Sequence, residues 1–121
     1  MGNNRKDRQG QEGSLKRVDI EIFQYAFYIY APCEKIAFEI EIDDRVGNND
    51  AALTCDNKVW IGHEGDVTGN CYHEASHVVD HLLEEHLKTK QGALGDNYEL
   101  RAYLMAWVGT QIRNYIQQEE I

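Results

Sequence analysis

The chain has 121 residues, of which 21 are acidic and 12 are lysine or arginine, so its formal net charge at pH 7 is −9. This length predicts one domain with a modest core, and the acidic balance argues against general nucleic-acid binding, which needs a basic surface. No apolar run approaches the length of a membrane span, and the polar first residues predict that there is no signal peptide.

The first segment, residues 1–16, is polar and contains glycine, so we expect a disordered arm in front of a single domain over residues 17–121. Four of its residues are lysine or arginine and two are acidic, which makes it locally basic. It is either a flexible terminus without a specific role or an arm that docks on an acidic partner or on DNA. This arm is the one place where we expect nucleic acid to bind.

The next segments alternate between strand-like and ambiguous patterns. Residues 18–30 are rich in β-branched and aromatic side chains and predict a strand. Residues 33–43 alternate like a strand, but Pro32 in front of them also suits the start of a short helix. Residues 45–50 form a loop. Residues 51–62 predict two short strands joined at Asp56 and Asn57.

Two helices follow. Residues 70–87 place apolar side chains and two histidines on one stripe and acidic side chains on the other side. Thr68 and Asn70 are candidate N-caps and Gly92 is a candidate stop signal. Residues 98–118 predict a second helix, capped by Asp96 or Asn97. The expected core positions in these helices are Cys71, Leu104, Trp107, Val108 and Ile112.

The first helix carries the motif His73-Glu74-Ala75-Ser76-His77, which is H-E-x-x-H. Residues four apart lie on one helix face, so His73 and His77 can bind one metal ion. Glu74 can reach a water on that metal and act as general base. The sequence therefore predicts a zinc site with one ion per chain.

A catalytic zinc site needs a third protein ligand further along the chain. Glu99 is the leading candidate, because 21 residues separate it from His77 and it opens the second predicted helix. A carboxylate in a first helical turn is favoured by the helix dipole. Asp80, Glu84 and Asp96 compete for this position.

The layout resembles the gluzincin metallopeptidases, in which H-E-x-x-H is followed by a glutamate ligand on a later helix. The stretches HEASHVVD (73–80) and NYELRAYL (97–104) are similar to small zinc-peptidase-like proteins encoded in bacteriophage and prophage genomes. The resemblance covers roughly residues 58–112 and implies an α+β fold, with a small N-terminal β-sheet packed on the motif helix and a second helix bearing the glutamate. It also implies that the strand at Trp60, Ile61 and Gly62 borders the cleft and holds an extended substrate by edge pairing.

Several further side chains are candidates for supporting roles. Asp80, one turn after His77, can accept a hydrogen bond from a ligating histidine or can be a solvated acid. His81 extends the metal face as a fourth ligand or an oxyanion helper, or is an ordinary histidine. Tyr103 shares a face with Glu99 and can stabilise an oxyanion or pack between the helices. The alternatives for oxyanion stabilisation are Tyr98, Tyr72 and Arg101.

The predicted activity is zinc-dependent peptide-bond hydrolysis, with a peptide or protein as substrate and Glu74 and Tyr103 as catalytic residues. A second hypothesis is a phage virion or assembly protein that uses zinc as a folding staple and contacts phage structural proteins. A third is a regulatory peptidase that cleaves a repressor. Cys33, Cys55 and Cys71 lack C-x-x-C spacing, so we expect free thiols in a reducing cytoplasm, with virion association as the alternative location.

Overall fold

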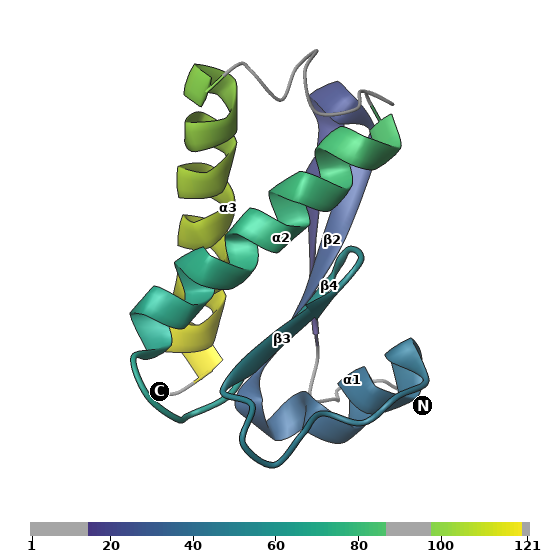
Figure 1. Ribbon diagram of the computed structural model, residues 1–121, viewed down its shortest axis with the longest axis vertical. Helices are drawn as coiled ribbons and strands as arrows, with labels where there is room; N and C mark the ends of the chain where they lie inside the picture. Colours follow the sequence, from purple (N-terminus) through teal and green to yellow (C-terminus); the bar gives the residue numbers. More distant parts are fainter. Residues whose placement is uncertain (1–14, 87–97, 120–121) are drawn as a thin grey trace, which may run out of the picture.

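The computed structural model describes residues 15–86 and 98–119, which form a small mixed sheet with helices on both faces (Figure 1). The sheet order is β1-β2-β4-β3, with β2 and β4 parallel and the other neighbours antiparallel. The predicted α+β class with a small sheet is confirmed. The elements are β1 (Lys16–Ile20), η1 (Glu21–Phe23), β2 (Tyr25–Tyr30), η2 (Pro32–Glu34), α1 (Lys35–Ile42), β3 (Ala52–Cys55), β4 (Lys58–Ile61), α2 (Val67–His86) and α3 (Tyr98–Glu119).

The single strand expected over residues 18–30 is wrong, because the chain reverses in the middle of it. β1 and β2 are antiparallel and Ile20 faces Tyr25 across the turn. The turn contains the 3-10 helix η1 and ends at Gln24, which adopts a left-handed conformation with φ of 52°. Ile22 is 84% exposed within it, so the apolar content of this segment does not belong to one continuous strand.

The structure decides the predictions for two further segments that precede the H-E-x-x-H motif. Of the two possibilities for residues 33–43, the helical one is confirmed, since Pro32 opens η2 and α1 follows it directly. The two short strands within residues 51–62 are also confirmed as β3 and β4. Asp56, at their junction, has φ of 55°, a left-handed conformation that Asp tolerates better than most residues.

Both predicted long helices are present, but the N-cap assignment for the first is wrong. α2 begins at Val67, and the Asp66 carboxylate accepts a hydrogen bond of 3.0 Å from the Gly69 main-chain N–H. This is the geometry of an aspartate N-cap, and it replaces the expected caps at Thr68 and Asn70. The expected stop signal at Gly92 and the expected caps at Asp96 and Asn97 lie outside the described residues.

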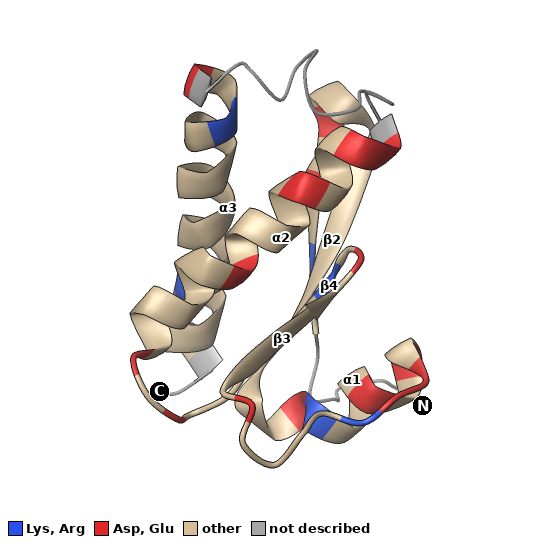
Figure 2. Cartoon of the chain, in the orientation of Figure 1, with Lys and Arg blue, Asp and Glu red and all other residues tan. Residues whose placement is uncertain are grey.

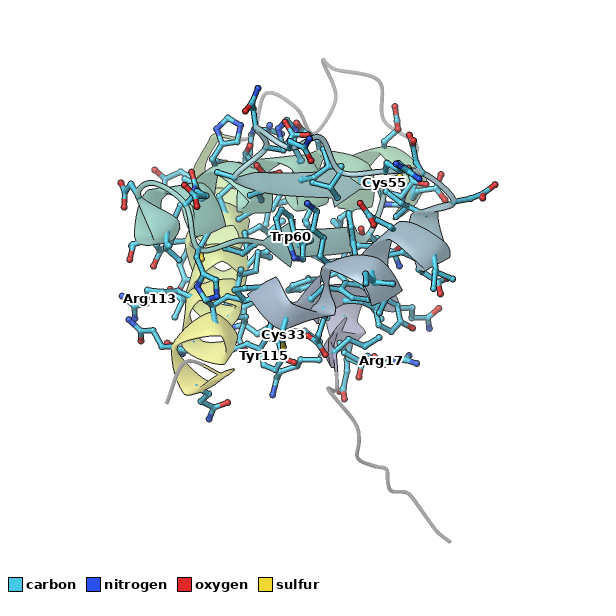
Figure 3. All side chains as sticks on the ribbon, turned by 90° about the horizontal axis from the view of Figure 1, so that it is seen from below. Arg17, Cys33, Cys55, Trp60, Arg113 and Tyr115 are labelled. Carbon is cyan, nitrogen blue, oxygen red and sulfur yellow. The ribbon has the colours of Figure 1, made fainter. Side chains whose placement is uncertain are left out.

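The alternation of side chains along the strands builds a separate core on each face of the sheet. On one face, Phe27, Ile29, Val59 and Ile61 pack with α2 and α3 in the larger core. On the other face, Tyr30, Trp60, Phe38 and Val46 form a smaller cluster beneath α1. Figure 3 shows Trp60 between the sheet and α1. The sheet thus separates α1 from the face on which α2 and its motif lie.

The core predictions for the two helices are mostly confirmed. Cys71, Leu104, Val108 and Ile112 are buried. Trp107 is 39% exposed, so its prediction as a core residue is wrong, and Tyr115 and Ile116 extend the core instead. No disulfide links Cys33, Cys55 and Cys71. Within the described residues, none of the helices has the length and apolarity needed to cross a bilayer.

A buried carboxylate also ties α3 to the chain that precedes α1. Glu34 is 6% exposed and accepts hydrogen bonds from the Ala31 main-chain N–H at 2.6 Å and from the Tyr115 hydroxyl at 3.2 Å. Figure 3 shows Tyr115 beside the segment that carries Cys33. Hydrogen bonds offset the cost of burying this polar group, and the bond from Tyr115 links the C-terminal half of α3 to η2.

Candidate active site

The H-E-x-x-H residues lie on α2 along a cleft between this helix and β3. The rings of His73 and His77 are exposed, with centroids 5.2 Å apart and planes inclined by 72°. Glu74 is 7% exposed. All three side chains line the cleft, which has a volume of about 580 Å³. The helical spacing that the sequence predicts therefore places two imidazoles and a carboxylate in one concave site.

The opposite wall of the cleft is β3, and it contacts the motif directly. The Thr54 hydroxyl donates a hydrogen bond of 2.7 Å to Glu74 Oε1 and lies 3.4 Å from the Glu74 main-chain oxygen. Three further lining residues are acidic, and Figure 2 shows acidic positions recurring along α2. The full lining is Ala52, Leu53, Thr54, Asp56, His73, Glu74, His77, Asp80, His81 and Glu84.

Asp80 lines the cleft but has a partner other than the one expected. Its carboxylate forms an ion pair and hydrogen bond with the guanidinium of Arg101 on α3. This contact joins the two long helices on the cleft side. Arg101, an alternative for oxyanion stabilisation, is engaged in this pair.

His81 occupies one end of the cleft and bridges three elements. Its Nδ1 lies 2.8 Å from the Tyr25 hydroxyl at the start of β2, and its Nε2 lies 3.7 Å from Asp56 Oδ1 at the β3–β4 turn. Burial raises the pKa of the Tyr25 phenol above its usual value, with Asp56 and Glu85 adding to the effect, so the hydroxyl keeps its proton at neutral pH. When that hydroxyl donates to Nδ1, the His81 proton sits on Nε2, facing Asp56.

Glu99 and Tyr103 are on α3 and are not among the residues that line the cleft. Both are exposed, and Tyr103 is 78% exposed, so the alternative in which it packs between the helices is wrong. α2 and α3 run antiparallel, since Tyr72 contacts Thr110 and Asp80 contacts Arg101. Glu99 is therefore level with the part of α2 that lies beyond Asp80. The side chain of Tyr98 lies outside the described part of the chain.

The edge strand beside the cleft is β3, which corrects the expected edge at Trp60, Ile61 and Gly62. β4 is an internal strand between β2 and β3, and Trp60 is buried on the opposite face. The Gly62 N–H bonds to the Ala51 oxygen at 2.8 Å. In antiparallel pairing the ladder bonds alternate, so with Leu53 opposite Trp60 the main-chain groups of Ala52 and Thr54 point away from β4.

The chemistry of this donor set suits zinc, which binds neutral imidazole and carboxylate. His73 and His77 present both rings from adjacent helical turns into the same cleft. Across residues 15–86 and 98–119, however, no three His, Cys, Asp or Glu side chains are grouped closely enough to hold a metal ion. The two histidines thus fit the ion, and the third ligand is not assembled beside them.

Sequence reasoning missed three side chains that shape the site, namely Thr54, Asp56 and Tyr25. Thr54 is 20 residues from Glu74, and Tyr25 is 56 residues from His81. Their contacts depend on the sheet order and on how α2 crosses it, so no local spacing could have indicated them. The one available signal is that Thr54 lies in a predicted strand just before the motif helix.

Comparisons with known proteins identify no relative, so a function has to be inferred from the residues of the cleft. No family model, no curated protein and no solved structure matches the chain.

Proposed function

We propose that the chain is a zinc-dependent hydrolase of peptide bonds, of the gluzincin-like type. The observation that carries the proposal is that His73, Glu74 and His77 line one cleft, with Glu74 buried and hydrogen-bonded at its base. A structural zinc site has no need of an acid placed between its two histidine ligands. The same cleft is open to solvent along α2 and large enough for a side chain with flanking main chain.

His73 and His77 would hold the ion, with Glu99 as the proposed third ligand. Bound zinc supplies Lewis-acid polarisation of a carbonyl and acidifies water. Because Glu99 lies outside the cleft lining, its recruitment requires the first turn of α3 to approach α2 when metal binds. Asp80 and His81, which already line the cleft, are the competing ligands.

Glu74 carries the proton chemistry in this proposal. Its carboxylate takes a proton from a water in the cleft as that water attacks the peptide carbonyl, and then gives the proton to the departing amine. The Thr54 hydroxyl holds Oε1, and no described residue hydrogen-bonds the other oxygen, Oε2. Oε2 is thus the oxygen available for the transfer.

The substrate is proposed to bind as an added strand at the β3 edge. The main-chain groups of Ala52 and Thr54 are directed away from β4 and toward the side of the sheet where the cleft lies. An extended peptide satisfies such groups by β-augmentation, with main-chain hydrogen bonds giving affinity. Pairing there brings a peptide alongside Glu74, which contacts the same strand.

The first test is the metal content of the purified protein and of His77→Ala, measured by elemental analysis after incubation with zinc and desalting. We expect about one zinc per chain in the wild type and almost none in the variant, because a site with one fewer imidazole loses most of its affinity. His63→Ala is the control, since His63 is an exposed histidine outside the cleft lining. A wild type without zinc would overturn the proposal.

The third ligand is identified by the zinc affinity of Glu99→Gln, Asp80→Asn and His81→Gln, measured by competition with a chelating dye. We expect Glu99→Gln to weaken binding by more than about 100-fold, which exceeds the 10- to 100-fold effect typical of residues that merely support a ligand. The other two variants should stay within that lower range. A larger loss in Asp80→Asn or His81→Gln would assign the third position to that residue.

A further inference from the structure

We infer that Thr54 is a positioning residue for Glu74, and that it couples binding of the substrate main chain to the orientation of the general base. This inference rests on the proposed function. It concerns a residue on β3, outside the H-E-x-x-H motif and outside the helix that carries it.

The geometry of the contact supports a role in orientation. The Thr54 hydroxyl donates to Glu74 Oε1 at 2.7 Å, a distance typical of a strong O–H···O bond to a carboxylate. Glu74 is 7% exposed, so the carboxylate has little water to replace this donor. A glutamate has three rotatable side-chain bonds. Fixing Oε1 removes most of that freedom at Oε2 as well, which is the atom that must receive a proton.

The position of Thr54 on the edge strand links binding of the substrate main chain to the orientation of Glu74. Thr54 and Val59 form a non-hydrogen-bonded pair, so the main-chain groups of Thr54 point away from β4. Its N–H and C=O are therefore available to a peptide added at the edge, while its side chain contacts Glu74 across the cleft. One residue thus contacts both the substrate main chain and the base, so the two are held in a fixed relation.

A β-hydroxyl suits this position because the residue must donate a hydrogen bond to Glu74 and also fit the edge strand. Threonine places its hydroxyl one carbon from a main chain that lies in the sheet, and its branched side chain favours the strand. Valine has nearly the same shape without the donor, whereas serine keeps the donor without the methyl group. These two substitutions separate the hydrogen bond from the packing of β3 on α2.

The test measures kcat and KM of Thr54→Val and Thr54→Ser on the fastest-cleaved internally quenched peptide from a random library, using zinc-loaded protein. We expect Thr54→Val to lower kcat by about 10- to 100-fold, the range for loss of one hydrogen bond to a charged group. KM should change by less than about threefold, because the main-chain groups at the edge are unaltered. Thr54→Ser should recover most of the kcat.

Further variants control for the loss of a hydroxyl elsewhere and for misfolding. Thr68→Val removes a hydroxyl from an exposed position on α2 and should leave kcat unchanged. Thr54→Ala removes the same hydroxyl with a smaller side chain, so it serves if Thr54→Val fails to fold, and zinc content is measured for every variant. An unchanged kcat in Thr54→Val, or no recovery in Thr54→Ser, would overturn the positioning role. A wild type that binds no zinc or cleaves no peptide would overturn the proposed function, and this inference with it.

Discussion

Glu74→Gln is expected to lower kcat for peptide hydrolysis by about 10²- to 10⁴-fold, the range that a positioned general base contributes. Glutamine has nearly the same shape and can still accept the Thr54 hydrogen bond through its amide oxygen, so the cleft should keep its form. It cannot take up a proton, and for that reason the chemical step should fail. The measurement is steady-state kinetics on zinc-loaded protein, with zinc content determined on the same sample.

The comparison variant for this experiment is Glu85→Gln, an exposed acid of α2 that lies outside the cleft lining. It removes the same charge without touching the motif and should change kcat by less than about threefold, as expected for an acid that takes no part in proton transfer. Equal losses in both variants would mean that the negative charge of α2 matters and that Glu74 is not the base. Full zinc binding without hydrolysis in the wild type would favour the structural or virion-assembly hypothesis.

Phe27→Ala is expected to lower the free energy of unfolding by about 3–5 kcal/mol, the usual cost of truncating a buried phenylalanine. Phe27 is completely buried on β2, an internal strand, and faces the core shared with α2 and α3. A small domain has a total stability of about 5–15 kcal/mol, so this substitution would remove a large part of that stability. Urea denaturation followed by circular dichroism measures the change.

Ile22→Ala is the matched control for this prediction, because Ile22 is an apolar residue of the same hairpin and is 84% exposed. Its substitution should change the free energy of unfolding by no more than about 0.5 kcal/mol. A similar loss of stability in both variants would contradict the core assigned from burial. Zinc binding by the surviving folded fraction of Phe27→Ala should be unaffected, since Phe27 does not line the cleft.

The elements with strong local signals could be predicted from the sequence. The motif helix has helical periodicity, although its N-cap is Asp66 and not the expected Thr68 or Asn70, and the β3–β4 turn has Asp56 and Asn57 at its tip. α1 was ambiguous because its apolar residues fit both a strand and a helix. Its structure follows from Pro32 and from burial of Phe38 against Trp60, and that second contact cannot be recognised from local sequence.

The remaining differences have physical causes that involve distant parts of the chain. The hairpin of β1 and β2 was missed because β-branched and aromatic side chains continue on both sides of the turn. The change of buried positions from even numbers (Val18 and Ile20) to odd numbers (Tyr25 and Phe27) marks the turn. The edge beside the cleft falls on β3 because β4 pairs in parallel with β2 and so becomes internal. Glu99 as third ligand stays a prediction.

The connection between β2 and β4 passes through α1 on the face of the sheet away from α2. The space between α2 and β3 in which the cleft lies is therefore left to these two elements. With the connection placed where it is, the exposed residues 47–50 lie outside the cleft lining, so this turn can change in length and composition without altering the face that carries the H-E-x-x-H motif. The turn before β3 is therefore a place where an added peptide or label should leave the cleft intact.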